Sequence, residues 1–151
     1  MYKRQLLYLL EGGVLDWSEA RKVTADICGA LWVLHSMGAV HRDVKESNVI
    51  LRGSDAVLID FDASRIVKPE HPADTVILGT TGYAAPEQFG MSQTDGRADI
   101  YSLGVLLNVM PTGQHPSRRV AEGRAGRIVR RCTMMNPDQR FHDVLELRDA
   151  L

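Results

Sequence analysis

The sequence predicts an α+β domain that is mainly helical, with short β-hairpins around one polar loop. Two helical patterns indicate this class: apolar residues recur at helical spacing between residues 17 and 37, and a nearly all-apolar stretch begins at Asp99. Two β-branched runs, 49–51 and 57–59, flank the turn 52–55 and predict a hairpin. The 151 residues suffice for one domain with its own core.

Composition excludes several classes of protein. Apolar content is 44%, charged content is 25% and the net charge is -1, so no bulk attraction to nucleic acid or anionic membrane is expected. No apolar run approaches the ~18 residues of a membrane span, and no signal peptide is readable. Cys28 and Cys132 lie in helical apolar patterns, which favours two buried thiols in a reducing cytoplasm over a disulfide.

The N-terminal region is the least determined part of the chain. Residues 1–5, MYKRQ, can be back-translated as GTG TAT AAG AGA CAG, a string similar to the transposase end left by some DNA library preparations. We therefore expect residues 1–5 to be a non-native leader and the domain to span residues 6–151. The apolar run 6–10 is compatible with a strand or a helix, and periodicity does not decide between them.

Residues 16–38 show the clearest helical pattern and lead directly into the polar loop. Asp16 and Glu19 form a capping box at the start, and Met37-Gly38 provides a stop. His35, near the C-terminal end, is expected to be structural and to meet the helix dipole.

The polar loop 41–48, HRDVKESN, offers a carboxylate at Asp43, an ammonium group at Lys45 and an amide at Asn48. The hairpin places Asn48 before its first strand and Asp60 after its second, so both can face one metal ion. Phosphoryl transfer needs such a set, because it depends mainly on positioning and charge neutralisation. A polar hairpin without catalytic function is the alternative.

This loop, followed by Asp60-Phe61-Asp62, is similar to the catalytic loop and metal-binding motif of eukaryotic-type (bacterial Hanks-type) protein serine/threonine kinases. The resemblance implies that Asp43 accepts or orients the proton of the substrate hydroxyl and that Lys45 meets the γ-phosphate of ATP. It further implies that Asn48 and Asp60 hold Mg²⁺, or Mn²⁺ in its place, together with the nucleotide. Ile50 would then pack under the adenine ring.

Residues 79–87, GTTGYAAPE, resemble the end of a kinase activation segment, and residues 63–82 are predicted to be an extended loop. By this resemblance Thr80 bridges Asp43 and Lys45, as in kinases directed to serine and threonine. Phosphorylation of Thr75, Thr80 or Thr81, with Arg42 receiving the phosphate, and an unmodified surface loop both remain open.

The C-terminal third is predicted to be helical. The apolar helix from Asp99 should stop at Pro111-Thr112-Gly113, and the final helix should run from Phe141 to Leu151. Between residues 118 and 131 the sequence has six arginines and only one acidic residue, Glu122. Such a basic run indicates either a docking surface or an ordinary solvated helix face. The resemblance implies that Asp99 holds the backbone of the catalytic loop and that Arg140 pairs with Glu87. His41, Arg42 and Phe61 complete the residues with structural or regulatory positions.

The sequence departs from the kinase pattern in two ways. Asp62 stands where glycine usually follows Asp-Phe, so backbone strain and a third carboxylate near the metal are expected. No G-x-G-x-x-G and no strand lysine with its helix glutamate are present, which are the parts that cover and orient the phosphates. The chain therefore resembles a C-terminal lobe without its N-terminal lobe, with residues 6–10 as the last strand of that lobe and 11–13 as the hinge.

The resulting hypothesis is the catalytic lobe of an ATP-dependent protein serine/threonine kinase that phosphorylates proteins. The fragment is expected to be inactive alone and to be cytoplasmic, with any membrane anchor outside it. Its expected partners are a protein substrate and the missing N-terminal lobe, with no nucleic acid. A pseudokinase-like binding scaffold and a small-molecule phosphotransferase of kinase-like fold are the alternatives. Lys45 and the segment Ala85-Pro86-Glu87 disfavour the second alternative.

Overall fold

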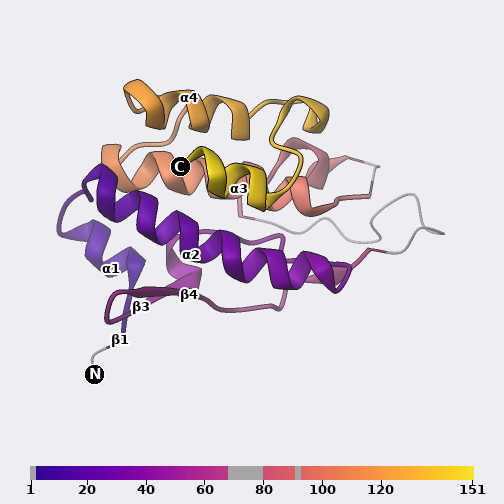
Figure 1. Cartoon of the computed structure of the whole chain (residues 1–151), viewed down its shortest axis with the longest axis horizontal. Coiled ribbons are helices and arrows are strands. Elements are labelled where there is room, and N and C mark those ends of the chain that lie inside the picture. The colour runs from indigo at the N-terminus through magenta and orange to yellow at the C-terminus, as the bar shows by residue number, and fades with distance from the viewer. Residues whose placement is uncertain (1–2, 68–79, 91–92) are drawn as a thin grey trace.

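The computed structural model describes residues 3–67, 80–90 and 93–151. Helices dominate and the strands gather at one side, so the prediction of a mainly helical α+β fold is confirmed (Figure 1). The helices are α1 (Leu6–Glu11), α2 (Trp17–Ser36), α3 (Gly96–Thr112), α4 (Gly123–Cys132) and α5 (Val144–Ala150). Three 3-10 turns lie between them, η1 (Glu46–Asn48), η2 (Pro86–Phe89) and η3 (Pro137–Gln139).

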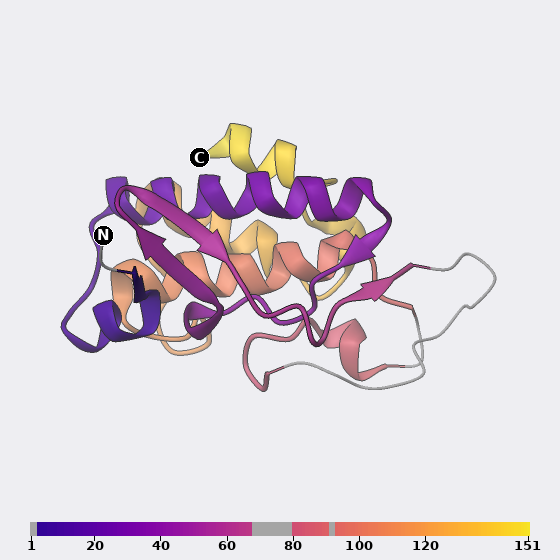
Figure 2. The same ribbon diagram turned by 90° about the horizontal axis from the view of Figure 1, so that it is seen from below.

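The strands form two small antiparallel sheets. One has the order β1-β3-β4, built from β1 (Lys3–Gln5), β3 (Val49–Arg52) and β4 (Asp55–Leu58), and the other pairs β2 (Ala39–Val40) with β5 (Arg65–Ile66). Val49 pairs with Leu58 and Arg52 with Asp55, which confirms the predicted hairpin around a tight turn. The hairpin lies beside α2, and β4 packs on that helix (Figure 2).

Helix α2 forms as its sequence predicts. The Asp16 side chain accepts the Glu19 N–H at 2.8 Å and the Glu19 carboxylate accepts the Asp16 N–H at 2.9 Å, so the capping box is complete. Ala20, Ile27 and Leu31 are fully buried on its inner face. The chain leaves the helix through Gly38, whose φ of +74° suits a residue without a Cβ.

Helix α3 is the central element, packed against both α2 and α4, and its residues from Ala98 to Asn108 are nearly all buried. It begins at Gly96 and continues through Pro111 to Thr112, so the predicted stop at Pro111-Thr112-Gly113 is confirmed. A proline near a helix end removes only its own N–H from the ladder. Gly113, at φ +67°, donates to the Val109 carbonyl and ends the helix.

The N-terminal region differs most from the prediction. Residues 6–10 are helical in α1, with Leu6 fully buried. Of the two alternatives, the helix is therefore confirmed, and the strand that the resemblance implied is wrong. Residues 3–5, set aside as part of a leader, form β1 and pair with β3. The final helix is shorter than predicted and starts at Val144, where Asp143 caps it. Among the described residues, no helix is long and apolar enough to cross a membrane.

Candidate active site

Asp99 anchors the start of the polar loop to α3. Its fully buried carboxylate accepts the backbone N–H of His41 at 2.9 Å and that of Arg42 at 2.8 Å. Arg42 has a left-handed φ of +69°, a conformation that an L-residue keeps only where its surroundings hold it. His35, from the end of α2, places Nε2 2.7 Å from the same carboxylate. Two helices therefore fix this end of the loop.

His41 joins the loop to the segment after β4. The Asp43 N–H donates to His41 Nδ1 at 3.2 Å, so Nε2 carries the ring proton and donates to the Ile59 carbonyl at 3.2 Å. The Phe61 ring packs edge-on against His41 at 5.1 Å between centroids. The His41 imidazole therefore connects the backbone at Asp43 with the backbone at Ile59, the residue before Asp60.

Asp43, Lys45 and Thr80 form a compact polar cluster. The Thr80 hydroxyl donates to Asp43 Oδ1 at 2.6 Å and accepts from Lys45 Nζ at 2.7 Å, while Lys45 Nζ lies 3.2 Å from Asp43 Oδ2. The side chains of Asp43 and Lys45 are 18% and 24% exposed, so a ligand can reach both. The contacts are those that the sequence resemblance implied for these three residues.

The Asp43 carboxylate is held in its ionised form. Burial raises its pKa, but the hydrogen bonds from Thr80, Lys45 and Asn48 and the charge of Lys45 outweigh burial and bring the pKa below its ordinary value. A carboxylate ionised at neutral pH can accept a proton or orient a hydroxyl.

Asn48 and Asp60 have the chemistry of a divalent-cation site. Asn48 Nδ2 donates to the backbone carbonyl of Asp43 at 2.8 Å and to its carboxylate at 3.0 Å, which leaves the amide oxygen of Asn48 for a cation. The Ile59 N–H donates to the Asn48 carbonyl at 2.8 Å, so Asp60 follows at the same end of the hairpin. One carboxylate and one amide oxygen suit Mg²⁺, which takes its remaining ligands from phosphates and water. The described residues contain no group of three or more His, Cys, Asp or Glu arranged for a metal.

Backbone strain lies at Asp60 rather than at Asp62. Asp60 has a φ of +62°, and its Oδ1 accepts the Asp62 N–H at 3.2 Å, whereas Asp62 is absent from the described non-glycine residues with positive φ. The expectation of strain at Asp62 is therefore wrong. Ile50 is half-buried on β3 between Gln5 and Val57. Thr75 lies outside the described residues, and Thr81 is exposed.

Glu87 and Arg140 form a buried, two-pronged ion pair. Arg140 Nη1 and Nη2 lie 2.6 and 2.9 Å from the two carboxylate oxygens of Glu87, and the arginine side chain is fully buried. The pair ties the end of the activation-type segment to the chain before α5. Sequence reasoning missed Gln88, whose side chain donates to the Arg42 carbonyl at 3.0 Å; its place directly after Glu87 was the available signal.

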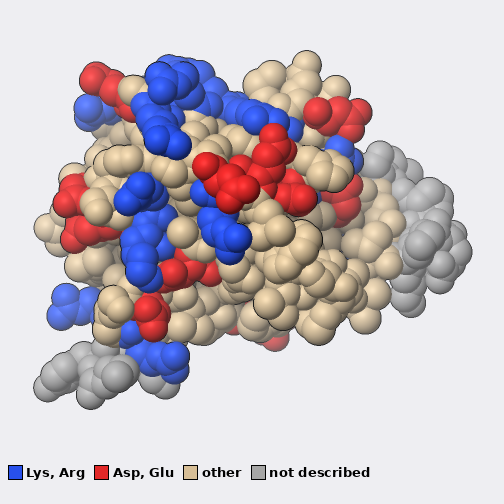
Figure 3. All heavy atoms as spheres, in the orientation of Figure 1, with Lys and Arg blue, Asp and Glu red and all other residues tan. Residues whose placement is uncertain are grey.

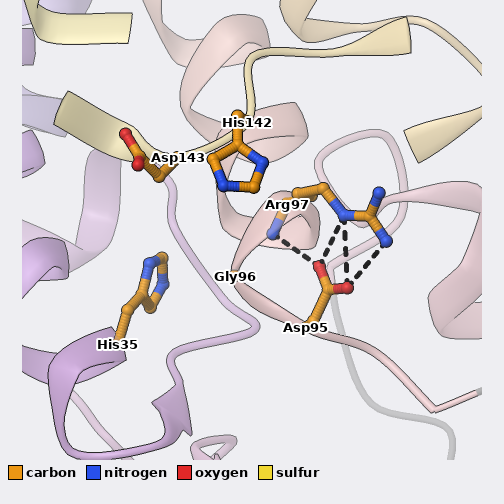
Figure 4. Close-up of a pocket in the computed structure, with 6 residues that line it drawn as sticks. All are labelled: His35, Asp95, Gly96, Arg97, His142 and Asp143. Atoms are coloured by element: carbon orange, nitrogen blue, oxygen red, sulfur yellow. Dashed lines mark hydrogen bonds and ion pairs between the residues drawn. The ribbon is translucent and has the colours of Figure 1, made fainter. Parts of the chain in front are cut away.

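Two surface features lie outside this cluster. A pocket of about 330 Å³ is lined by His35, His142, Asp143 and residues 95–97 (Figure 4). Within it, the Asp95 carboxylate already accepts hydrogen bonds from the Arg97 side chain. Lys and Arg side chains gather over α4 (Figure 3), where Arg131 pairs with Glu146 at 2.6 Å and Arg124 donates to the Ala150 carbonyl. Some arginines of the basic run therefore make surface contacts within the chain, and the predicted docking role stays a prediction.

Comparison with known proteins supplies an independent finding. The family model described as "Protein kinase domain" matches residues 1–146. The chain is 34% identical over 138 residues to the putative wall-associated receptor kinase-like 11 of Arabidopsis thaliana, covering 87% of this chain and 18% of that protein. It is 36% identical over 108 residues to the serine/threonine-protein kinase PknB of Mycobacterium tuberculosis, covering 69% of this chain and 17% of PknB. The chain thus spans less than a fifth of the length of these relatives.

Proposed function

The chain belongs to the protein kinase family, and on this premise we propose that it is the catalytic lobe of an ATP-dependent protein serine/threonine kinase. The observation that carries the proposal is the Thr80 hydroxyl held between Asp43 and Lys45. A protein hydroxyl of similar size, brought to the same carboxylate, would be oriented for attack on a phosphate. The names of the relatives, which include a serine/threonine-protein kinase, support the substrate class.

Each residue of the cluster has a separate task in this proposal. Asp43 accepts the hydrogen bond of the substrate hydroxyl and takes its proton as the oxygen bonds to the γ-phosphorus of ATP and the bond from that phosphorus to the leaving ADP breaks. Lys45 places a positive charge beside that oxygen and the transferred group. Asn48 holds the Asp43 carboxylate in position through its amide N–H, and its amide oxygen would be a ligand for a cation. Asp99 keeps the loop backbone in place.

The nucleotide and metal complete the site. ATP supplies the phosphoryl group, and a divalent cation, for which we propose Mg²⁺ with Mn²⁺ as a substitute, neutralises the charge on its phosphates. Asn48 and Asp60 would hold the cation, and Ile50 would contact the adenine. We further propose an N-terminal lobe as partner, because the sequence has no glycine-rich phosphate loop. We also propose a cytoplasmic location for this chain, because its cysteines, Cys28 and Cys132, are free and buried, as is usual for proteins in a reducing compartment.

Phosphate transfer to a library of Ser- and Thr-containing peptides, measured with labelled ATP, tests the proposal. The assay uses the polypeptide that carries these residues together with an N-terminal lobe. Asp43→Asn should lower the rate by about 10²–10⁴-fold, because amide nitrogen and oxygen cannot take the proton. Asp149→Asn, at an exposed site on α5, is the matched control and should leave the rate unchanged.

Full activity in Asp43→Asn would remove Asp43 from its catalytic role. Absence of transfer in the parent protein, with ATP binding retained, would instead favour the binding-scaffold alternative.

A further inference from the structure

His115 lies in the segment between α3 and α4, and hydrogen bonds from a buried side chain of α3 hold this segment in place. The fully buried Asn108 of α3 donates through Nδ2 to the carbonyls of Gln114 at 2.9 Å and Arg119 at 2.7 Å. Its Oδ1 accepts the Ala121 N–H at 2.8 Å. The segment around His115 is therefore attached to the most buried helix of the molecule.

The ring of His115 has a defined proton position. The Ser117 N–H donates to Nδ1 at 3.1 Å, and a backbone N–H can only donate, so Nδ1 is the acceptor nitrogen. The ring proton then lies on Nε2, which donates to the Gly82 carbonyl at 2.8 Å. The half-buried imidazole thus joins two segments that are 33 residues apart in sequence.

Gly82 lies in the middle of the turn that presents Thr80 to the active site. The N–H groups of Tyr83 and Ala84 both donate to the Thr80 carbonyl, at 3.0 and 2.9 Å. Gly82 itself has a φ of +91°, and a Cβ placed there would lie 3.8 Å from the His115 ring, so the ring runs alongside this backbone. Gly82 and Thr80 therefore belong to one hydrogen-bonded turn.

Several contacts hold this turn, and the Tyr83 side chain adds a hydrogen bond to Glu46. Thr80 contacts Asp43 and Lys45, the Tyr83 carbonyl accepts the Ser102 hydroxyl at 2.6 Å, and the Gly82 carbonyl accepts His115. The first contact belongs to the catalytic cluster and the second comes from α3. His115 supplies the attachment from outside both, at the solvent-facing side of the turn.

We infer that His115 is a positioning residue that fixes the turn 80–84 against the helical body, so that a protein substrate meets a preformed surface beside Asp43. The inference rests on the proposed kinase function, because it assigns the purpose of the turn. A preformed surface lowers the cost of ordering the chain when a substrate binds. Loss of the tether should therefore weaken the use of the protein substrate and leave the nucleotide unaffected.

Amide hydrogen exchange of this chain tests the tether without requiring activity. In His115→Ala, residues 80–90 should exchange about threefold to tenfold faster, the loss expected for one net hydrogen bond, while residues 96–112 keep their protection. His115→Gln retains an N–H donor near the position of Nε2 and should restore most of the protection. His142→Ala removes an exposed histidine outside this turn and is the control, with exchange equal to that of the parent.

Kinetics test the positioning role in the polypeptide that carries an N-terminal lobe. His115→Ala should raise KM for the peptide substrate by about threefold to tenfold and leave KM for ATP unchanged. Unchanged exchange at 80–90, or faster exchange throughout α3, would overturn the tether, and an unchanged peptide KM would overturn the positioning role. If the parent transfers no phosphate, the proposed function fails, while the exchange comparison still decides the tether.

Discussion

The side chain of Asp62 distinguishes two interpretations of the turn formed by residues 60–62, for which we propose a role in metal binding. The family resemblance places a glycine there, but the left-handed residue is Asp60, and Asp62 uses its N–H to hold the Asp60 carboxylate. Asp62→Gly should therefore change the free energy of unfolding by less than about 1 kcal/mol, as for other exposed sites without special geometry. Urea denaturation measures this change.

Asp60→Ala is the comparison for that experiment. It keeps the backbone strain at φ +62° but removes the carboxylate that accepts the Asp62 N–H. Stabilisation of the protein by Asp62→Gly would contradict the assignment of strain to residue 60, because glycine relieves strain only at a residue with positive φ.

The Glu87–Arg140 pair gives a second prediction for single residues. Arg140→Ala should destabilise the protein by about 3–5 kcal/mol, because it leaves the Glu87 carboxylate without its partner in a poorly hydrated site. Denaturation in guanidinium chloride, monitored by circular dichroism, measures the loss.

Asp138→Asn is the matched control, since this residue pairs with Arg97 but is 79% exposed. It should cost no more than about 1 kcal/mol. Equal effects of the two substitutions would show that burial does not determine the strength of these pairs.

Individual residues were predictable where chemistry and spacing coincide. The carboxylates and the lysine of the polar loop could be found from sequence because a reaction limits their types and offsets. His115 could not, since it acts through the backbone carbonyl of Gly82, which no residue pattern encodes, and the only signal for Gln88 was its place directly after Glu87. His35 was expected to meet a helix dipole, whereas its partner is Asp99, 64 residues away.

Among the elements, α3 and α4 pack so closely that one glycine determines their separation. A Cβ at Gly104 would overlap the Cβ of Cys132 on α4. Gly104→Ala should therefore destabilise the protein by about 1–3 kcal/mol through overpacking, despite the better helix propensity of alanine. Thermal unfolding measures the change.

Gly29→Ala is the matched substitution within α2, where a Cβ would meet nothing within 4 Å. With no steric conflict, the helix propensity alone should stabilise the protein by up to about 1 kcal/mol. Opposite signs for the two glycines are expected, and the same sign would refute the role of close packing.

Elements were predictable in proportion to their length and their caps. Helix α2 carries a complete capping box and a long apolar stripe, and both of its ends were found. The five apolar residues 6–10 fit either a strand or a helix, and only packing of α1 against η1 and β3 decides for the helix. Strand β1 pairs with residues 50–52, and this long-range pairing cannot be predicted from the local sequence around residues 3–5.

For the whole molecule, ionised carboxylates couple stability to pH. Burial raises the pKa of Asp95, but its bonds to Arg97 outweigh that effect and lower the pKa, and Asp43 behaves similarly. Because the pKa values are lower in the folded protein, the unfolded chain binds more protons near the ordinary Asp pKa of about 3.9. Stability should thus be full above about pH 5 and fall progressively as the pH drops through 4.

Urea midpoints at pH 7, 5, 4 and 3 measure this dependence. Asp95→Asn keeps a capping side chain for α3 but cannot ionise, so its midpoint should fall less between pH 5 and pH 3 than that of the parent. Parallel pH curves for the two proteins would exclude a contribution from Asp95.

The bonds to Asp99 also bear on the order in which the molecule assembles. This carboxylate accepts the N–H groups of His41 and Arg42, which lie 58 and 57 positions earlier in the chain. The start of the polar loop therefore lacks this anchor until α3 has been synthesised and has docked. A nascent polypeptide that ended before residue 95 would already hold every side chain proposed to touch nucleotide or metal. It would still lack the geometry, which places maturation of the reactive centre among the late steps on the ribosome.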